Sequence, residues 1–179
     1  MGNIMSIFIT PVIETERLIL RPLTMNDAKA VFEWTGDRRV AEYMIYPCHE
    51  SIKVTREWLY SLANLENEYT WGFVRKSDNK LIGSGGIRLR TDENVWSFGY
   101  NLRYDCWSMG YATESAKRMI EYAYSENNAR EFVAEHAIEN ISSGKVIEKC
   151  GLVFEGYSQY SKLDNSRTFK CKKYRMILK

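Results

Sequence analysis

A strand pattern that runs into a helix pattern across a short loop does most to limit the folds open to this chain. Residues 95–104 alternate strictly between apolar and polar or small side chains, as expected for a strand with one packed face. From Gly110 the apolar residues recur at helical spacing as far as about residue 127. A small-residue loop at a helix N-terminus presents unpaired backbone N–H groups, which bind phosphate or pyrophosphate. We therefore predict a phosphate-bearing cofactor at residues 104–114.

The size and charge of the chain exclude several classes of protein. Its 179 residues suit one domain with its own core, expected over residues 12–179 after a loose leader over residues 1–11. A net charge of +2 predicts no strong attraction to nucleic acid or to a membrane surface. No apolar run approaches the roughly 20 residues that span a bilayer. We expect a cytoplasmic protein.

Residues that bind metals or form disulfides are few and scattered. The cysteines Cys48, Cys106, Cys150 and Cys171 include no C-x-x-C pair, which is typical of reduced, packed thiols in a cytosolic protein. With only 2 histidines in the chain, a zinc site is not expected. The opening residues match a myristoylation signal through Gly2, but so short a match often arises by chance.

Periodicity and turn residues divide the rest of the chain into strands and helices. We expect strands over residues 13–21, 70–75, 81–90, 95–104, 131–138, 152–160 and 168–178. We expect helices over residues 24–36, 37–43, 51–65, 110–127 and 141–150. The apolar positions of the third helix are Val54, Trp58, Leu62 and Leu65. This order predicts a single α/β domain built on a mixed sheet.

The strand–loop–helix segment resembles a motif of a known family. Residues 107–115 read Trp-Ser-Met-Gly-Tyr-Ala-Thr-Glu-Ser and resemble motif A of the GNAT N-acetyltransferase superfamily. The similarity is to the branch that includes the ribosomal-protein N-terminal acetyltransferases, where this motif reads Trp-Gly-x-Gly-Tyr-Ala-Thr-Glu-Ala. Residues 140–152 resemble that branch's Asn-x-x-Ser…Glu-Lys-x-Gly-Phe signature, and residues 14–22 resemble its first strand. The resemblance thus runs from about Glu14 to the C-terminus.

The resemblance implies a fold and a cofactor. In the GNAT acyl-CoA N-acyltransferase fold, the fourth strand separates from the fifth and leaves a slot for the pantetheine arm of acetyl-CoA. Backbone groups of Leu102 and Tyr104 would pair with this arm, and Asn140 would contact it. Backbone amides of the loop and first helical turn would hold the pyrophosphate. The residues concerned are Trp107, Ser108, Met109, Gly110, Tyr111, Ala112 and Thr113.

Two serines, Ser108 and Ser143, occupy key positions of this implied site. Relatives have glycine at position 108, so Ser108 is unfavourable if the backbone there needs a positive φ. Ser143 shares an inward-facing stripe of the expected short helix with Val146, Ile147 and Cys150. In the family it is a candidate to protonate or hydrogen-bond the departing thiolate. A plain helix-capping serine is the alternative.

The resemblance does not identify the general base. Relatives often carry a glutamate two residues before the Gly-Tyr pair, where this chain has Ser97. Glu135 on the next strand is our candidate and His136 the second, and only one of these neighbours can face the cleft. The alternatives are a plain surface role for Glu135, a proton relay from Ser97 through water, and a substrate that binds deprotonated.

These features together predict an N-acetyltransferase that moves an acetyl group from acetyl-CoA to a primary amine by direct attack in a ternary complex. The acceptor would be a protein N-terminus or a small amine; no metal is expected, and a homodimer is compatible with the sequence. Aromatic residues of the first helices either roof the acceptor pocket or belong to the core. They are Trp34, Tyr43, Tyr46 and Trp58. The rival interpretation is a catalytically inactive acyl-CoA-binding sensor or scaffold, which Ser97 and Ser108 favour.

Overall fold

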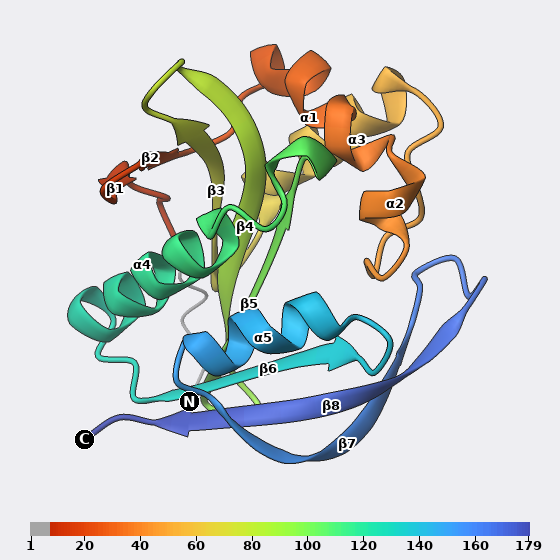
Figure 1. Ribbon diagram of the computed structural model, residues 1–179. Helices are drawn as coiled ribbons and strands as arrows, with labels where there is room; N and C mark the ends of the chain where they lie inside the picture. Colours follow the sequence, from red (N-terminus) through yellow and green to blue (C-terminus); the bar gives the residue numbers. More distant parts are fainter. Residues whose placement is uncertain (1–7) are drawn as a thin grey trace.

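An eight-stranded sheet organises the computed structural model, which describes residues 8–179 (Figure 1). Its strands are β1 (Ile13–Glu14), β2 (Leu18–Arg21), β3 (Glu68–Arg75), β4 (Lys80–Arg90), β5 (Val95–Leu102), β6 (Glu131–Ala137), β7 (Val153–Ser161) and β8 (Thr168–Ile177). Their order across the sheet is β1-β2-β3-β4-β5-β6-β8-β7. The helices are α1 (Ala28–Thr35), α2 (Arg38–Ala41), α3 (Ile52–Ser61), α4 (Tyr111–Glu126) and α5 (Ile141–Lys149). The predicted single mixed α/β domain is confirmed.

The sheet opens between β5 and β6. These two strands run parallel and are connected by the crossover helix α4. They pair only at Trp96 with Phe132 and at Ser97 with Val133. Beyond those residues β5 continues beside β4, while β6 continues beside β8. The expected separation of the fourth and fifth predicted strands is therefore present.

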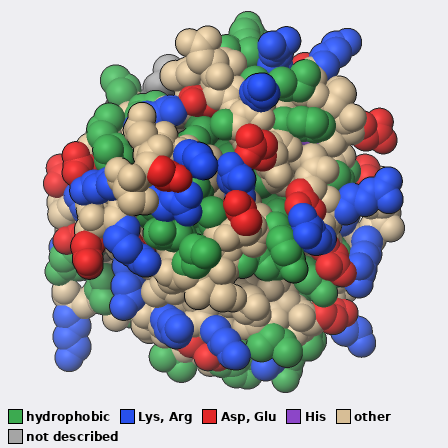
Figure 2. Space-filling view, turned by 45° about the horizontal axis from the view of Figure 1, so that its top comes forward, with side chains coloured by type: hydrophobic (Ala, Val, Ile, Leu, Met, Phe, Trp, Pro, Cys, Tyr) green, Lys and Arg blue, Asp and Glu red, His purple; other side chains and the backbone are tan. Residues whose placement is uncertain are grey.

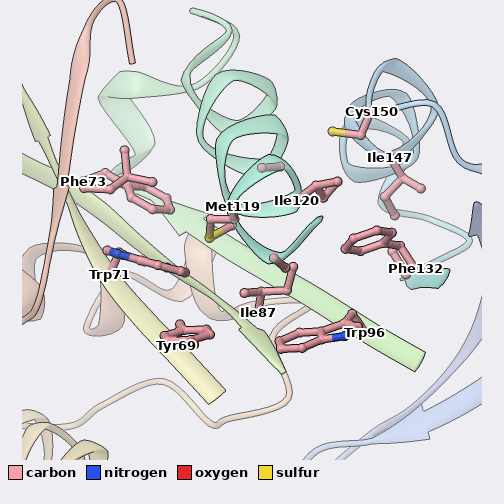
Figure 3. Packing of buried hydrophobic residues seen from close by; sticks show 14 of the residues in the cluster. Tyr69, Trp71, Phe73, Ile87, Trp96, Met119, Ile120, Phe132, Ile147 and Cys150 are labelled. Atoms are coloured by element: carbon pink, nitrogen blue, oxygen red, sulfur yellow. The ribbon is translucent and has the colours of Figure 1, made fainter. Parts of the chain in front are cut away.

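Helices cover both faces of the sheet. On one face, Ile147 of α5 lies beside Phe132 of β6, and Met119 of α4 lies nearer Phe73 of β3 in the same main core (Figure 3). On the other face, α1 and α3 form a second apolar cluster that includes Val74. Phe73 belongs to the first cluster, as expected when neighbouring residues of a strand point to opposite faces. The sheet therefore separates an α4–α5 face from an α1–α3 face.

The prediction of one strand over residues 13–21 is wrong. These residues form a hairpin in which β1 pairs with β2. The Thr15 hydroxyl accepts a hydrogen bond from the backbone N–H of Leu18 at 2.9 Å, and a Glu114 oxygen accepts one from the N–H of Arg17 at 2.9 Å. Side-chain partners of this kind stabilise a turn where apolar alternation alone suggests a continuous strand.

The end of β5 also differs from the prediction. The strand stops at Leu102, and Tyr104 lies in a 3-10 turn over Tyr104–Cys106, where its side chain is exposed. The backbone N–H of Cys106 donates to the carbonyl of Arg103 at 3.0 Å, which closes this turn. Turn geometry therefore replaces strand pairing two residues earlier than the alternation indicates.

The predicted apolar face of the third helix is only partly correct. α3 ends at Ser61 and buries Thr55 and Leu59, whereas Val54 is exposed. The Thr55 hydroxyl lies 2.9 Å from Nδ1 of His49 and 3.2 Å from the hydroxyl of Thr35. These polar partners hold Thr55 inward, while Trp58 and Leu62 of the predicted face still pack, half-buried, against the α1–α3 cluster.

Part of the expected leader packs on the sheet. The ring of Phe8 stacks on that of Tyr69 with centroids 4.6 Å apart, and the carbonyl of Pro11 accepts a 2.7 Å hydrogen bond from the indole N–H of Trp71. Phe8 and Pro11 are therefore held against the sheet, whereas Ile9 between them is exposed. The remaining leader residues 1–7, with the myristoylation match at Gly2, lie outside the described residues.

The surface and the helices agree with the charge and hydropathy of the sequence. In the view of Figure 2, Lys and Arg side chains are intermixed with Asp and Glu, in keeping with the net charge of +2. Among residues 8–179, no helix combines the length and the apolar character that crossing a membrane requires.

Candidate functional site

The loop that precedes α4 adopts an unusual backbone conformation. Ser108 has a φ of 61° and Gly110 a φ of 85°, so both residues are left-handed. Loops of this kind can form concave rows of backbone N–H groups, and the first amides of a helix lack helical partners. The other non-glycine residues of the described chain with positive φ are all asparagines: Asn67, Asn79, Asn94, Asn128 and Asn165. Ser108 therefore occupies a position whose geometry suits glycine, the residue that the resembling motif has there.

Contacts from two directions hold this loop in place. A guanidinium nitrogen of Arg17 donates to the carbonyl of Met109 at 2.9 Å, and the Arg17 guanidinium lies 4.5 Å from the centre of the Tyr111 ring. The indole N–H of Trp107 donates to the carbonyl of Leu102 at 3.0 Å. The β1–β2 hairpin and the end of β5 thus fix the loop from either side.

Glu114, in the first turn of α4, ties the helix to the β1–β2 hairpin. Its carboxylate accepts hydrogen bonds from the Thr15 hydroxyl at 2.5 Å and from Nε of Arg17 at 2.7 Å. Burial alone would raise the pKa of Glu114, but these hydrogen bonds and the Arg17 charge outweigh it and hold that pKa below its ordinary value. The negative charge also suits the N-terminal end of a helix.

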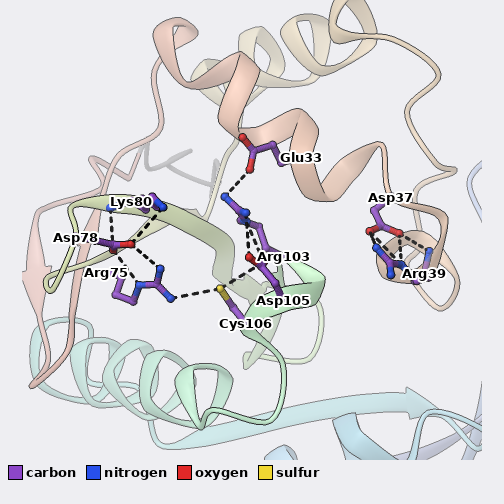
Figure 4. A network of polar contacts seen from close by, with 9 residues as sticks. All are labelled: Glu33, Asp37, Arg39, Arg75, Asp78, Lys80, Arg103, Asp105 and Cys106. Atoms are coloured by element: carbon purple, nitrogen blue, oxygen red, sulfur yellow. Dashed lines mark hydrogen bonds and ion pairs between the residues drawn. The ribbon is translucent and has the colours of Figure 1, made fainter.

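A network of charged side chains supports the other side of the loop (Figure 4). Arg75 forms an ion pair with Asp78 at 2.6 Å and points a second nitrogen at the sulfur of Cys106, 3.8 Å away. Arg103 forms ion pairs with Glu33 of α1 and with Asp105. The 3-10 turn after β5 is therefore linked to both the β3–β4 hairpin and α1.

The predicted pyrophosphate residues lie together at the start of α4. Trp107, Ser108 and Met109 are exposed, Gly110 caps the helix, and Tyr111 is buried. Ala112 and Thr113 are half-buried in the first helical turn. Backbone amides at a helix N-terminus are a common place for anions to bind, so this group is the candidate phosphate site.

We call the opening between β5 and β6, beyond the residues at which the two strands pair, the splay. The residues predicted to contact the pantetheine arm lie on both sides of it. Leu102 is buried at the end of β5, and Tyr104 follows it in the exposed 3-10 turn beneath the guanidinium of Arg39. Asn140 lies across the splay as the N-cap of α5. The carbonyl of Leu102 already accepts the indole N–H of Trp107, so one of its two lone pairs is used within the chain.

Ser143 lies at the splay and pairs with a tyrosine that the sequence did not single out. Its hydroxyl is 3.1 Å from the hydroxyl of Tyr100 on β5. Asn140, not Ser143, caps the helix: its side-chain oxygen accepts a hydrogen bond from the backbone N–H of Ser143 at 3.2 Å. Burial raises the pKa of Tyr100 well above its ordinary value, because a phenolate would be poorly solvated there. Tyr100 therefore remains a hydroxyl donor over the working pH range.

Glu135 and His136 point to opposite faces of β6, as expected of strand neighbours. Glu135 is exposed and accepts a hydrogen bond from the hydroxyl of Ser158 on β7 at 2.6 Å. His136 is buried beneath α5, where a Cβ built on Gly144 would lie only 2.6 Å from its Nε2. Its Nδ1 lies 2.7 Å from the carbonyl of Ala137. The structure thus packs His136 against the helix and leaves Glu135 on the α1–α3 face.

The aromatic residues of the first helices divide between core and surface. Trp34 is completely buried in the α1–α3 cluster, and Tyr46 is also enclosed, with burial raising the pKa of its hydroxyl. Tyr43 and Trp58 are half-buried. Trp34 is therefore a core residue rather than part of a pocket roof.

Two residues of this region escaped the sequence analysis, Tyr100 and Glu68. Tyr100 had no predicted role beyond the alternating pattern of residues 95–104 and the Gly-Tyr pair that follows Ser97. Glu68 opens β3, and the signal that could have identified it is an acidic residue directly before a run of buried positions. Among residues 8–179, no three His, Cys, Asp or Glu side chains gather in a way that would hold a metal ion.

Comparisons with known proteins agree with this geometry. The family model described as Acetyltransferase (GNAT) domain matches residues 17–153. The uncharacterized N-acetyltransferase YoaA of Bacillus subtilis (strain 168) is 27% identical over 171 residues, which cover 93% of this chain and 97% of that protein. A crystal structure of a GNAT-family acetyltransferase from Bacillus anthracis is 24% identical, with a TM-score of 0.83 over 93% of this chain and 98% of its own.

A further structural relative was solved with ligands. The spermidine N-acetyltransferase of Vibrio cholerae, in complex with CoA and spermine, is 19% identical, with a TM-score of 0.76 over 91% of this chain and 96% of its own. At that identity the likeness concerns the fold. The match of the family model spans the loop, both strands of the splay and the helix that carries Ser143. The chain therefore belongs to the GNAT acetyltransferase family.

Proposed function

We propose that this protein transfers an acetyl group from acetyl-CoA to a primary amine by direct attack within a ternary complex. The observation that carries the proposal is the Tyr100–Ser143 hydroxyl pair at the splay between β5 and β6. A left-handed loop at a helix N-terminus lies at the end of the same β5. A slot, a phosphate loop and a hydroxyl donor are the parts that an acyl-CoA donor requires.

The residues of the chain fit acetyl-CoA as a co-substrate. We assign the pyrophosphate to the backbone amides of residues 107–113, and the pantetheine arm to the β5 edge around Leu102 and Tyr104 and to Asn140. The left-handed residues of the loop support the first assignment. The second is supported by the edge of β5, which pairs with β6 no further than Ser97 in the described residues. When bound, acetyl-CoA supplies a thioester whose acyl group an amine can accept.

Ser143 and Tyr100 would stabilise the sulfur that leaves the thioester. A departing thiolate needs a hydrogen-bond donor or a proton, and a hydroxyl beside it supplies either. Tyr100 stays protonated, and its O–H has two acceptors on Ser143, the side-chain hydroxyl at 3.1 Å and the backbone carbonyl at 3.4 Å. We assign its proton to the nearer hydroxyl oxygen. The proton of Ser143 is then free to point toward the sulfur. In this proposal Tyr100 orients Ser143.

The cysteines support direct attack rather than a covalent acyl carrier. Cys106 and Cys150 are both buried, and burial raises the pKa of the Cys150 thiol to about 11. Burial likewise raises the pKa of Cys106 above its ordinary value. A nucleophilic cysteine needs a depressed pKa and access to substrate. Neither thiol meets that requirement.

The general base and the acceptor are the least constrained parts of the proposal. Glu135 is our sequence candidate for the base, and its exposed position on the α1–α3 face supports a location on the acceptor side. Its hydrogen bond from Ser158 competes with that role. The motif at residues 107–115 supports a place near the ribosomal-protein N-terminal acetyltransferase-like branch, and so a protein N-terminus or a small amine as acceptor.

A steady-state assay with acetyl-CoA and a panel of amines tests this proposal. The panel contains an arylalkylamine, a polyamine, an amino sugar and peptides with free N-termini, and the measured product is free CoA thiol. We expect turnover with at least one amine, well above hydrolysis without an acceptor. Tight CoA binding with no turnover on any amine would contradict the proposal and favour the acyl-CoA sensor that Ser97 and Ser108 suggest.

A further inference from the structure

A partly buried carboxylate lies on the face of the sheet opposite α4 and α5. Tyr69 packs into the main core, so its strand neighbour Glu68 points to the α1–α3 face. The Thr70 hydroxyl donates to Oε1 of Glu68 at 3.2 Å, and within residues 8–179 Glu68 forms no ion pair. Burial raises the pKa of Glu68 above its ordinary value, although the Arg88 charge and the Thr70 hydrogen bond oppose that shift. Arg88 lies opposite Glu68 on β4 but forms no ion pair with it, so the carboxylate is only partly compensated and its retention calls for an explanation.

Between Glu68 and the splay, two neighbouring strand positions are glycines and have no side chain. Gly86 of β4 pairs with Thr70 of β3 on one side and with Gly99 of β5 on the other. A Cβ built on Gly86 would lie 3.1 Å from Oε1 of Glu68, so the carboxylate lies over this glycine. A Cβ built on Gly99 would meet no described atom within 4 Å. The sheet surface from the carboxylate across Gly86 to Gly99 is therefore not covered by side chains of those two residues.

This sheet surface ends where the strands separate. Gly99 lies two residues beyond Ser97, which is the last residue of β5 to pair with β6. Neighbouring strands are about 5 Å apart, so the Glu68 carboxylate is roughly one strand spacing from Gly99. That separation exceeds direct hydrogen-bond reach and suits a contact through the substrate or one water molecule. Ser97, at the position of the glutamate expected by resemblance, lies on the same face.

A cavity of about 410 Å³ adjoins the carboxylate on the side away from the splay. It lies between α3, the loop after β2 and residues 8–10, and Leu59, Leu62 and Leu65 contribute to its walls. Glu68 is the one lining residue that carries a charge at neutral pH. Volumes of this size accommodate small organic ligands. The threonines Thr10, Thr24 and Thr70 also line the cavity, so its wall is partly apolar. One carboxylate beside such a wall suits a single ammonium on a largely apolar body, because a polycation would need several counter-charges.

We propose that Glu68 binds the acceptor amine and takes up its proton, and that the adjoining cavity holds an apolar alkyl or aryl body. The inference rests on the proposed acetyl transfer and names its acceptor class as apolar monoamines. The ammonium gives one proton to the Glu68 carboxylate through water, which leaves a neutral amine and a carboxylic acid. The nitrogen lone pair forms the C–N bond, and the C–S bond breaks with its electron pair going to the sulfur, which departs as a thiolate. The thiolate takes the second amine proton, and Glu68 releases its own to water.

The test compares Glu68→Gln with the matched control Glu66→Gln, an exposed glutamate two residues earlier in the chain. The acceptors are phenethylamine, spermidine and a peptide with a free N-terminus. For phenethylamine we expect kcat/KM to fall roughly 100-fold in Glu68→Gln and to change less than about twofold in Glu66→Gln. The dissociation constant for acetyl-CoA and the thermal midpoint at pH 7 should not worsen in Glu68→Gln, which separates an acceptor role from a structural one.

Three outcomes would overturn the inference while leaving the acetyl transfer intact. The first is wild-type activity of Glu68→Gln with phenethylamine. The second is a preference of the wild-type protein for spermidine or the peptide over phenethylamine. The third is a loss in Glu135→Gln as large as that expected for Glu68→Gln, together with an active Glu68→Gln. A wild-type protein without turnover on any amine would instead contradict the proposed function itself.

Discussion

At the scale of single residues, Ser108 holds a backbone conformation that its side chain disfavours. Its φ of 61° is in the left-handed region, where a residue with a Cβ is less stable than glycine by roughly 1 kcal/mol. We expect Ser108→Gly to raise the free energy of unfolding by about 0.5–1 kcal/mol in urea titrations. The control Ser77→Gly, in a turn residue whose φ is not positive, should lower it by a few tenths of a kcal/mol. Equal losses in both variants would show that residue 108 is unstrained.

The Tyr100–Ser143 pair makes a second prediction at this scale. Ser143→Ala removes the hydroxyl closest to the expected sulfur, and Tyr100→Phe removes the hydroxyl 3.1 Å from it. We expect kcat to fall at least tenfold in Ser143→Ala and less in Tyr100→Phe, while KM for acetyl-CoA changes less than about threefold in both. Ser142→Ala, at the exposed neighbouring position of α5, is the matched control. A kcat within twofold of wild type in Ser143→Ala would exclude a role in thiolate departure.

At the scale of secondary-structure elements, the junction between the β1–β2 hairpin and α4 makes stability depend on pH. The folded-state pKa of Glu114 is lowered, so its stabilising contribution is complete above the unfolded value near 4.5 and is lost as the pH falls below it. Glu114→Gln should therefore lower the urea midpoint at pH 7 more than at pH 3.5. Glu121→Gln, an exposed α4 glutamate paired with Arg118, should show almost no such difference. A pH-independent effect of Glu114→Gln would contradict the assignment.

The bounds of helices were easier to predict from the sequence than the residues that each element buries. Glycine and asparagine stops placed α4 and α5 to within a residue or two, because caps are local signals. The hairpin at residues 13–21 was missed since its turn depends on Glu114, almost a hundred residues away in the chain. The inward position of Thr55 in α3 was missed because it depends on pairing with His49 and Thr35. Long-range side-chain partners leave no periodic trace in a sequence.

At the scale of the whole molecule, the sheet brings two half-sites together at one opening. The loop before α4 and the hydroxyl of Ser143 lie on the α4–α5 side, whereas Glu68, Gly86 and Gly99 lie on the α1–α3 side. The two faces of the sheet are connected through the splay, because β5 and β6 are not paired there. The sequence motif leads to the proposed cofactor half, because its loop and helix are continuous in the chain. The acceptor half depends on the register of three strands, which no motif encodes.

The central claim is that an amine attacks acetyl-CoA directly while both are bound at the splay. Initial rates measured with acetyl-CoA and the best amine varied together, with the acetylated product identified by mass spectrometry, test it most directly. The account predicts double-reciprocal lines that intersect, one acetyl group on the amine, and no acetylated form of the protein when the amine is omitted. Parallel lines together with an acetylated cysteine on the protein would contradict it.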